Sequence, residues 1–245
     1  MLIERITKKN LGSYLQQEIF TPLGLKSIGF QAEFGGDVTS REENAGIFWP
    51  RQLRTETGFL TIDEAKPVQV ERHDAFPEGM YHTGRLGTGL VASAADYARL
   101  LTILLPENDG KDPVTGYRLI SPSSVAEITS PQLPVHILND SRNIDTSSAS
   151  PIILPGIVDS SSKDPKGSYG LACGVQGAER VLQDGKRGRS KGSVYWYGAA
   201  NTEFWVDKQK GIVVFVNGNY YPWNEGVWTD FVAGVEGIIY EGLRE

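Results

Sequence analysis

The spacing of hydrophobic residues predicts helices from the first residues of the chain. Leu2, Ile3 and Ile6 share one helical face, and no N-capping residue precedes them. A second helix is expected from about Asn10 to the residue before Pro22, because proline disfavours the α region for the residue that it follows. We therefore expect the chain to begin inside a helical part of its fold.

The middle of the chain has the clearest helical periodicity of hydrophobic residues. Ser93 is the expected N-cap, and Asp96 stands three residues later as in a weak capping box. The apolar stripe of this helix, which we interpret as core, consists of Tyr97, Leu100, Leu101, Leu104 and Leu105. A shorter helix is expected from residues 121–122, with proline at its first position and Val125 and Ile128 buried.

The last third changes to the period of strands. Strands are predicted at residues 169–175, 193–196, 202–207 and 212–216. A hairpin turn at residues 208–211 is expected to join the last two of them. A final amphipathic helix presents Trp228, Phe231, Val232, Val235 and Ile239 on one face. The prediction is an α+β fold in which an antiparallel meander is flanked by helices.

Two long stretches lack periodicity. Residues 29–87 are loop-rich and residues 131–168 are polar and rich in serine and proline. Loops of this length in a compact protein are usually functional, for instance as one wall of a binding cleft. We expect one domain over residues 1–245, with residues 1–168 mainly helical or loop and residues 169–245 forming strands and the C-terminal helix.

Composition narrows the class of protein only slightly. The 245 residues are 40% hydrophobic and 22% charged, and Lys+Arg 24 against Asp+Glu 30 gives a formal net charge of -6. This balance argues against disorder and against broad attraction to nucleic acid or anionic lipid, and no apolar run reaches the ~20 residues of a membrane span. With one cysteine, Cys173, and three scattered histidines, we expect no disulfide, no metal and no cofactor. The expected location is cytoplasmic.

Two short motifs imitate nucleophile signatures. Residues 188–192 match G-x-S-x-G, but a nucleophile elbow needs an apolar strand before it and a helix after it, whereas polar residues precede this match and a strand follows. Residues 160–163 match S-x-x-K within a serine-rich stretch that has no apolar face to bury the lysine. Neither is expected to supply a nucleophile.

Several segments in order resemble the β-lactamase-related serine hydrolases, which include class C β-lactamases, D-alanyl-D-alanine carboxypeptidases and esterases. The matching segments are YL at residues 14–15, IFTPLGL at 19–25, GF at 29–30, GLVASAADYAR at 89–99, LISP at 119–122, YGLACGV at 169–175, GSVYWYGAAN at 192–201 and FWVD at 204–207. The third family motif opens here with a tryptophan, and in this it resembles the fungal transesterase branch of the family. That branch contains the lovastatin side-chain acyltransferases.

The resemblance implies a site at residues 196–199. In this family a serine of S-x-x-K attacks a carbonyl, a lysine and a tyrosine of Y-x-N or Y-x-S manage protons, and a strand with W-x-G lines the substrate. Here Trp196, Tyr197 and Gly198 would bind substrate, and the backbone N–H of Ala199 would stabilise the oxyanion. Tyr197 departs from the small residue usual at its position, which is expected to narrow the pocket.

The chain opens after the place where the family has its S-x-x-K and Y-x-N motifs. The implied fold is therefore β-lactamase/transpeptidase-like without the N-terminal strands and nucleophile helix, and the chain alone is expected to be inactive. The leading hypothesis is an acyl-enzyme hydrolase or acyltransferase acting on a small-molecule acyl substrate, paired with a second chain or an N-terminal half. The alternatives are a non-catalytic ligand- or partner-binding remnant of the fold and an unrelated α+β binding domain.

Overall fold

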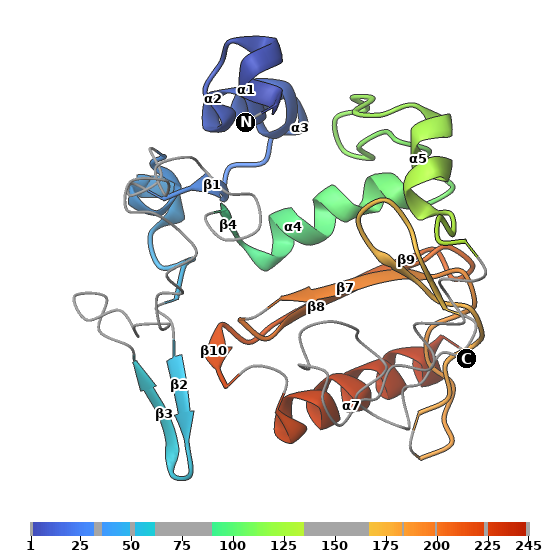
Figure 1. The fold of residues 1–245 in the computed structure, drawn as a ribbon. Coiled ribbons are helices and arrows are strands. Elements are labelled where there is room, and N and C mark those ends of the chain that lie inside the picture. The colour runs from blue at the N-terminus through green and yellow to red at the C-terminus, as the bar shows by residue number, and fades with distance from the viewer. Residues whose placement is uncertain are drawn as a thin grey trace.

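A five-stranded antiparallel sheet organises the computed structural model, which describes residues 2–31, 36–49, 52–61, 90–134, 167–182, 184–198, 200–222 and 225–243 (Figure 1). Neighbouring strands follow one another along the chain, in the order β5-β6-β7-β8-β9. The strands are β5 (Ser168–Tyr169), β6 (Gly174–Val175), β7 (Val194–Gly198), β8 (Thr202–Asp207) and β9 (Ile212–Asn217). The predicted α+β meander is confirmed, as is the turn at 208–211.

Helices cover both faces of this sheet (Figure 1). Phe204 and Val206 of β8 pack toward α4 (Ala94–Leu101) and the short 3-10 helix η5 (Thr102–Leu104), together with buried Leu101 and Leu105. Trp205, between them, packs on the opposite face against α7 (Gly226–Gly242). Because successive side chains of a strand point to opposite faces, β8 is buried from both sides at its centre.

The N-terminal helix runs further than the sequence predicts. After α1 (Leu2–Thr7), α2 (Leu11–Leu15) continues through a π-helical turn, η1 (Gln16–Phe20), into α3 (Thr21–Leu23). The expected end before Pro22 is wrong by two residues. The π turn moves the hydrogen bond of the Thr21 N–H to Gln16 O, and Pro22 falls in the first turn of α3, where no intrahelical acceptor is needed.

The cap of α4 also ties the N-terminal helices to the sheet layer. Ser93 Oγ accepts the Asp96 N–H at 3.2 Å, as predicted. The Asp96 carboxylate does not close a capping box; it accepts the N–H of Ser27 at 2.7 Å. Ser27 directly precedes β1 (Ile28–Phe30), which pairs with β4 (Leu90–Ala92), so this carboxylate joins segments that lie far apart in sequence.

The loop-rich stretch holds a hairpin that periodicity does not reveal. Short 3-10 turns, η3 (Val38–Ser40) and η4 (Glu42–Asn44), precede β2 (Gln52–Thr55) and β3 (Gly58–Thr61). β2 also pairs in parallel with β10 (Tyr220–Tyr221), and Arg54 forms an ion pair with Glu225 at the start of α7. Residues 62–89 and 135–166 lie outside the described part.

The predicted strand over 169–175 is wrong, because the chain turns back within it. Strands β5 and β6 are its two ends, and the Gly170 N–H donates to Cys173 O at 2.8 Å across the turn. The turn rests on α5 (Pro122–Thr129), which begins with proline as predicted and is capped by Ser121. A Cβ on Gly170 would lie 2.2 Å from Ile128 O, so only glycine permits this approach. Val125 is buried as expected, whereas Ile128 is half-buried.

The buried face of α7 differs from its predicted stripe. Trp228 and Val232 are buried, but Phe231 is 55% exposed. Glu236 takes a core position instead, and its side chain is fully buried. The hydrophobic pattern missed this because an acidic residue in a helix is normally assigned to the solvent face.

Glu236 is buried because Arg189 is buried opposite it. The Arg189 guanidinium donates to both Glu236 carboxylate oxygens, at 3.1 and 2.9 Å, and also to Glu203 of β8 at 2.9 Å. It lies over the rings of Tyr195 and Trp205. Arg189 stands in the G-x-S-x-G match, and the neighbouring Ser190 N–H donates to Asp207 at 2.8 Å. The G-x-S-x-G match therefore has a structural role, which is to hold α7 against the sheet. This agrees with the prediction that it is not a nucleophile elbow.

This buried pair predicts a pH-dependent stability. Burial alone would raise the pKa of Glu236, but the charge and hydrogen bonds of Arg189 lower it to about 2. The pair's contribution is thus present above the ordinary carboxyl pKa and lost as pH falls through the folded value. Glu236→Gln should lower the free energy of unfolding at neutral pH by about 3–5 kcal/mol, measured by urea denaturation.

The matched control is Glu179→Gln, which removes an exposed partner of Arg187 and should cost under about 1 kcal/mol. An equal loss in both variants, or a Glu236→Gln variant whose stability falls in acid as steeply as the parent's, would contradict this account.

Candidate active site

The residues predicted to bind substrate lie where β7 loses one of its neighbours. Trp196, Tyr197 and Gly198 all belong to β7 and pair with β8. On the other side, β6 pairs only with Val194 and Tyr195. Within the described sheet, β7 from Trp196 onward is paired with β8 and extends beyond the end of β6, and the end of a strand ladder is a place where an extended ligand can approach a strand.

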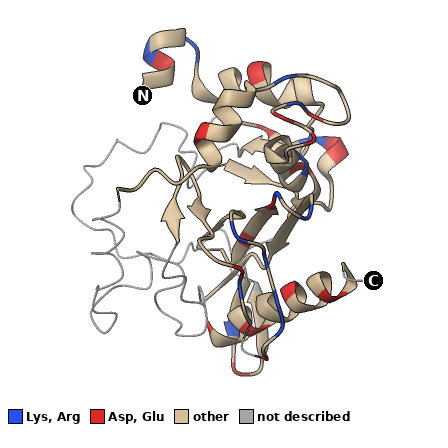
Figure 2. Cartoon of the chain, turned by 90° about the vertical axis from the view of Figure 1, so that its right-hand side faces the viewer, with Lys and Arg blue, Asp and Glu red and all other residues tan. Residues whose placement is uncertain are grey.

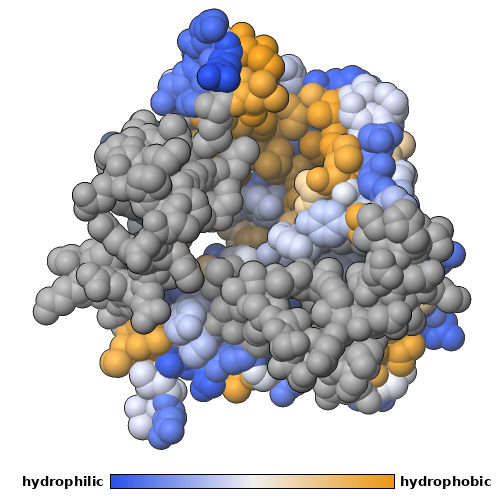
Figure 3. Space-filling model, viewed as in Figure 1, coloured by the Kyte–Doolittle hydropathy of each residue, from blue (hydrophilic) through white to orange (hydrophobic). Residues whose placement is uncertain are grey.

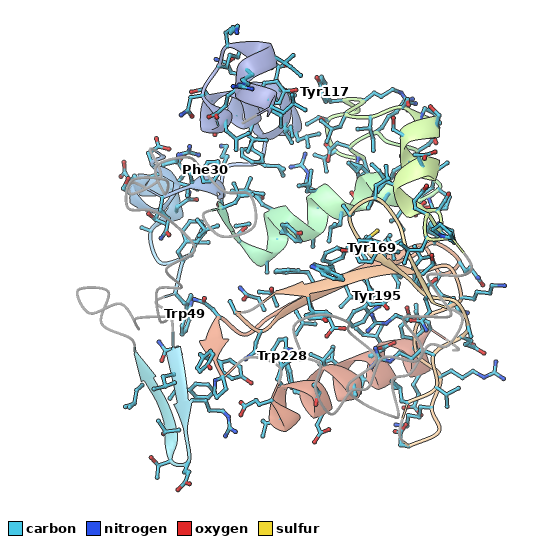
Figure 4. The ribbon with its side chains drawn as sticks, viewed as in Figure 1. Phe30, Trp49, Tyr117, Tyr169, Tyr195 and Trp228 are labelled. Carbon is cyan, nitrogen blue, oxygen red and sulfur yellow. The ribbon has the colours of Figure 1, made fainter. Side chains whose placement is uncertain are left out.

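An aromatic cluster lines this end of β7. The Trp196 ring meets Tyr169 edge-on at 5.2 Å between centroids and stacks with the Tyr197 ring at 5.1 Å. Tyr169 lies on the α4 side of the sheet, whereas Tyr195 points to the α7 side (Figure 4). Sequence reasoning placed Tyr169 only in a family segment and did not single it out; its contact with Trp196 depends on the β5–β6 turn, which was not predicted.

Gly198 and Tyr197 are held by their partners on β8. A Cβ on Gly198 would lie 2.6 Å from Thr202 Oγ1 across the strand pair, so a side chain there would force Thr202 to shift. Tyr197 pairs with Glu203, and burial raises the pKa of its phenol. The tyrosine is thus a neutral, half-buried group at neutral pH.

The turn after β7 is fixed by a buried asparagine. Asn201 has a φ of 53°, and its side-chain amide donates to Tyr220 O at 3.0 Å and Pro222 O at 2.8 Å. Its own carbonyl accepts the Gly218 N–H at 2.7 Å. Ala199, the predicted oxyanion donor, lies outside the described residues, and its role stays a prediction. The residues that follow it in the turn are held in place by the hydrogen bonds of Asn201.

The surface above the sheet is hollowed. The space-filling view shows a concave region between the N-terminal helices, α4 and the sheet, with hydrophobic residues along its upper wall (Figure 3). On the α4 face of the sheet, Tyr97 packs against Phe204 and Phe215, with ring centroids 6.0 and 4.9 Å apart. The apolar wall and the aromatic residues at the end of β7 together suit a small, largely apolar ligand.

Other chemistries find little support in the described part of the chain. No group of three or more His, Cys, Asp or Glu side chains there could hold a metal ion. Basic and acidic residues of the described part are interspersed in the view of Figure 2. No helix in the described ranges is long and apolar enough to cross a membrane. The S-x-x-K match at 160–163 falls outside these ranges.

The family model for beta-lactamase matches residues 1–235. The chain belongs to the β-lactamase family. The curated relatives include monacolin J acid methylbutanoyltransferase from Aspergillus terreus, 24% identical over all of this chain and 52% of the relative. The ML-236A carboxylate methylbutanoyltransferase of Penicillium citrinum is 22% identical over 99% of this chain and 51% of that protein. The chain thus spans about half the length of these relatives.

Solved structures agree on the fold. A simvastatin synthase variant from Aspergillus terreus superposes with a TM-score of 0.72 at 21% identity, over 99% of this chain and 52% of that one. EstCE1, described as a hydrolase with promiscuous acyltransferase activity, gives a TM-score of 0.53 at 17% identity, over 89% of this chain and 48% of that one. The resemblance to the fungal transesterase branch, which the tryptophan at the start of the third family motif indicates, is confirmed, and so is the β-lactamase-like fold.

The anchoring of the turn after β7 can be tested with Asn201→Gly. Glycine accepts the positive φ, so the variant isolates the loss of the side-chain hydrogen bonds and leaves two carbonyls without their donor. We expect the free energy of unfolding to fall by about 2 kcal/mol in urea denaturation. The control, Asn219→Gly, also has a positive φ of 48°, but its amide bonds to Trp49 O in an exposed setting and should cost under about 1 kcal/mol. Equal losses would contradict the anchoring role.

Proposed function

We propose that this chain forms the sheet-borne wall of the active site of a serine-dependent acyl enzyme, a hydrolase or acyltransferase acting on small ester, thioester or amide substrates. The observation that carries the proposal is the position of Trp196–Gly198 on β7, paired with β8 and beyond the end of β6, in a family member whose relatives are named as methylbutanoyltransferases. We further propose that residues 1–245 belong to one domain, with the sheet-bearing part at residues 169–245.

Each residue of this segment has a proposed task. Trp196, with Tyr169 behind it, offers an apolar surface to the acyl group or its acceptor. Gly198 lets the substrate approach the backbone, and the N–H of Ala199 stabilises the negative charge that develops on the carbonyl oxygen. Tyr197 limits the width of the pocket. The serine nucleophile and its lysine and tyrosine partners belong to sequence outside these 245 residues.

A non-catalytic function is the second candidate. The observation that favours it is that the chain spans about half the length of its relatives. In that case the same segment would bind a ligand or a partner without turnover.

The oxyanion role predicts a specific kinetic defect. Ala199→Pro removes the backbone N–H, whereas Ala199→Gly retains it. In the protein isolated from its own cells, assayed for thioester and p-nitrophenyl ester turnover, the proline variant should lose about 10²–10³-fold in kcat. The glycine variant should stay near the parent. Equal kcat values for the parent and a folded proline variant would refute the assignment.

The 245-residue chain produced alone should be inert. We expect no steady release of p-nitrophenol from p-nitrophenyl butyrate above the solvent rate, because the chain contains no nucleophile that we assign. Ser160→Ala is the informative comparison. Steady turnover by the parent chain that this variant abolishes would show that the S-x-x-K match at 160–163 is functional, and the proposal would fail.

A further inference from the structure

The outward face of α7 carries a row of apolar residues. Val227, Phe231 and Ile238 are 57%, 55% and 71% exposed, and Gly234 is exposed between the last two. These residues follow one another at intervals of four, three and four positions, which is the spacing of one helical face. We call these four residues the outer stripe of α7. At the rise of an α-helix, the stripe is about 16 Å long.

The opposite face of α7 already has its partners. Trp228 and Val232 pack in one hydrophobic cluster with Trp205 of β8. On the same side, the carboxylate of Glu236 pairs with Arg189. The helix is therefore apolar on two opposite sides, and the sheet covers one of them. A helix that is hydrophobic around most of its circumference is typical of a protein interior rather than of a surface.

Gly234 has the same implication as the exposed side chains. A Cβ built on it would meet no described atom within 4 Å, so no contact in the described part of the chain requires a glycine there. Glycine is unfavourable in the interior of a helix, because its backbone loses more conformational freedom than that of other residues. The advantage of glycine is that a second backbone can approach it closely. This advantage is used only if a further segment lies on the outer stripe.

The charges of α7 disfavour a second copy of the same helix as that segment. The exposed charged residues of α7 are Asp230 and Glu241, and the helix contains no lysine or arginine. Glu241 pairs with Lys186 at 3.3 Å, so Asp230 is the acidic group that a neighbour would meet. A second α7 would bring further carboxylates and no cation, and like charges across an interface are destabilising. An apolar segment that carries lysine or arginine fits better.

We propose that the outer stripe of α7 is the docking site of an apolar segment of the same protein that lies outside these 245 residues, with a basic residue facing Asp230. The length of the relatives supports this occupant, because this chain spans only about half of each of them. A protein of that length has about as many residues again to pack on the same fold. The inference rests on the proposed function only in that both place further sequence beside this chain.

A charge placed in the outer stripe tests whether the stripe is covered. Lysine is a better helix former than isoleucine and suits the C-terminal part of a helix, so Ile238→Lys should not lower the melting temperature if position 238 faces solvent. If the segment is docked, the substitution buries a charge. The Tm of the protein isolated from its own cells should then fall by several degrees.

The matched control is Val114→Lys. Val114 is also 71% exposed, but it lies in a turn outside α7, and its replacement should leave the Tm nearly unchanged. Tm values that are unchanged in both variants, or equally lowered in both, would overturn the proposal.

Photo-cross-linking identifies the occupant without a destabilising charge. A benzoylphenylalanine is incorporated in place of Phe231 in the full protein, and cross-linked peptides are identified by mass spectrometry after irradiation. We expect a cross-link to a peptide outside these 245 residues, with no increase in the mass of the chain. A cross-link to a second copy or to another protein would overturn the proposal. Cross-links confined to these 245 residues, or none at all, would do the same.

Treatment with a fluorophosphonate separates this inference from the function proposed for β7. The expected cross-link in a protein that forms no serine adduct would support the docking site and contradict the proposed function. A serine adduct outside these 245 residues in a protein without the cross-link would support the proposed function and overturn the docking site.

Discussion

The ion pair between Arg189 and Glu236 is the contact on which the arrangement of the sheet depends. Both side chains are withdrawn from water, 1% and 0% exposed, and burying two charges is favourable only when the geometry and the remaining hydrogen bonds are good. Here the carboxylate accepts from the guanidinium and from the Arg189 N–H at 2.7 Å, and Arg180 approaches it at 3.4 Å. The pair fixes α7 against one face of the sheet in a single register.

The same arginine reaches toward the proposed active site. Its contact with Glu203 lies on β8 directly opposite Tyr197, and its guanidinium covers the ring of Tyr195, two residues before Tyr197 on β7. The segment that carries Trp196 and Gly198 is therefore supported on the α7 side of the sheet by the buried charges of Arg189 and its carboxylate partners. On the α4 side, Val194 of β7 and Phe204 of β8 belong to the hydrophobic cluster that includes Tyr97 and Leu101. A rigid strand is a suitable platform for placing a backbone N–H against a developing charge.

Sequence predicted the parts of the structure that local chemistry determines. The cap at Ser93, the helix start at residues 121–122 and the turn at 208–211 follow from residues that are neighbours in the chain. The buried position of Glu236 and the reversal at Gly170 depend on partners far away in sequence, Arg189 and Ile128, and no local pattern contains that information. The site residues came from the resemblance of an ordered set of segments, whereas the contact of Tyr169 with Trp196 required the fold.

The central claim is that the end of β7 serves a serine nucleophile that these 245 residues do not supply. It is tested most directly by treating the protein isolated from its own cells with a fluorophosphonate and locating the adduct by peptide mass spectrometry. The account predicts an adduct on a serine followed three residues later by lysine, in a peptide outside the sequence described. An adduct on a serine within these 245 residues, or a native protein of 26.9 kDa that takes up no phosphonate, would contradict it.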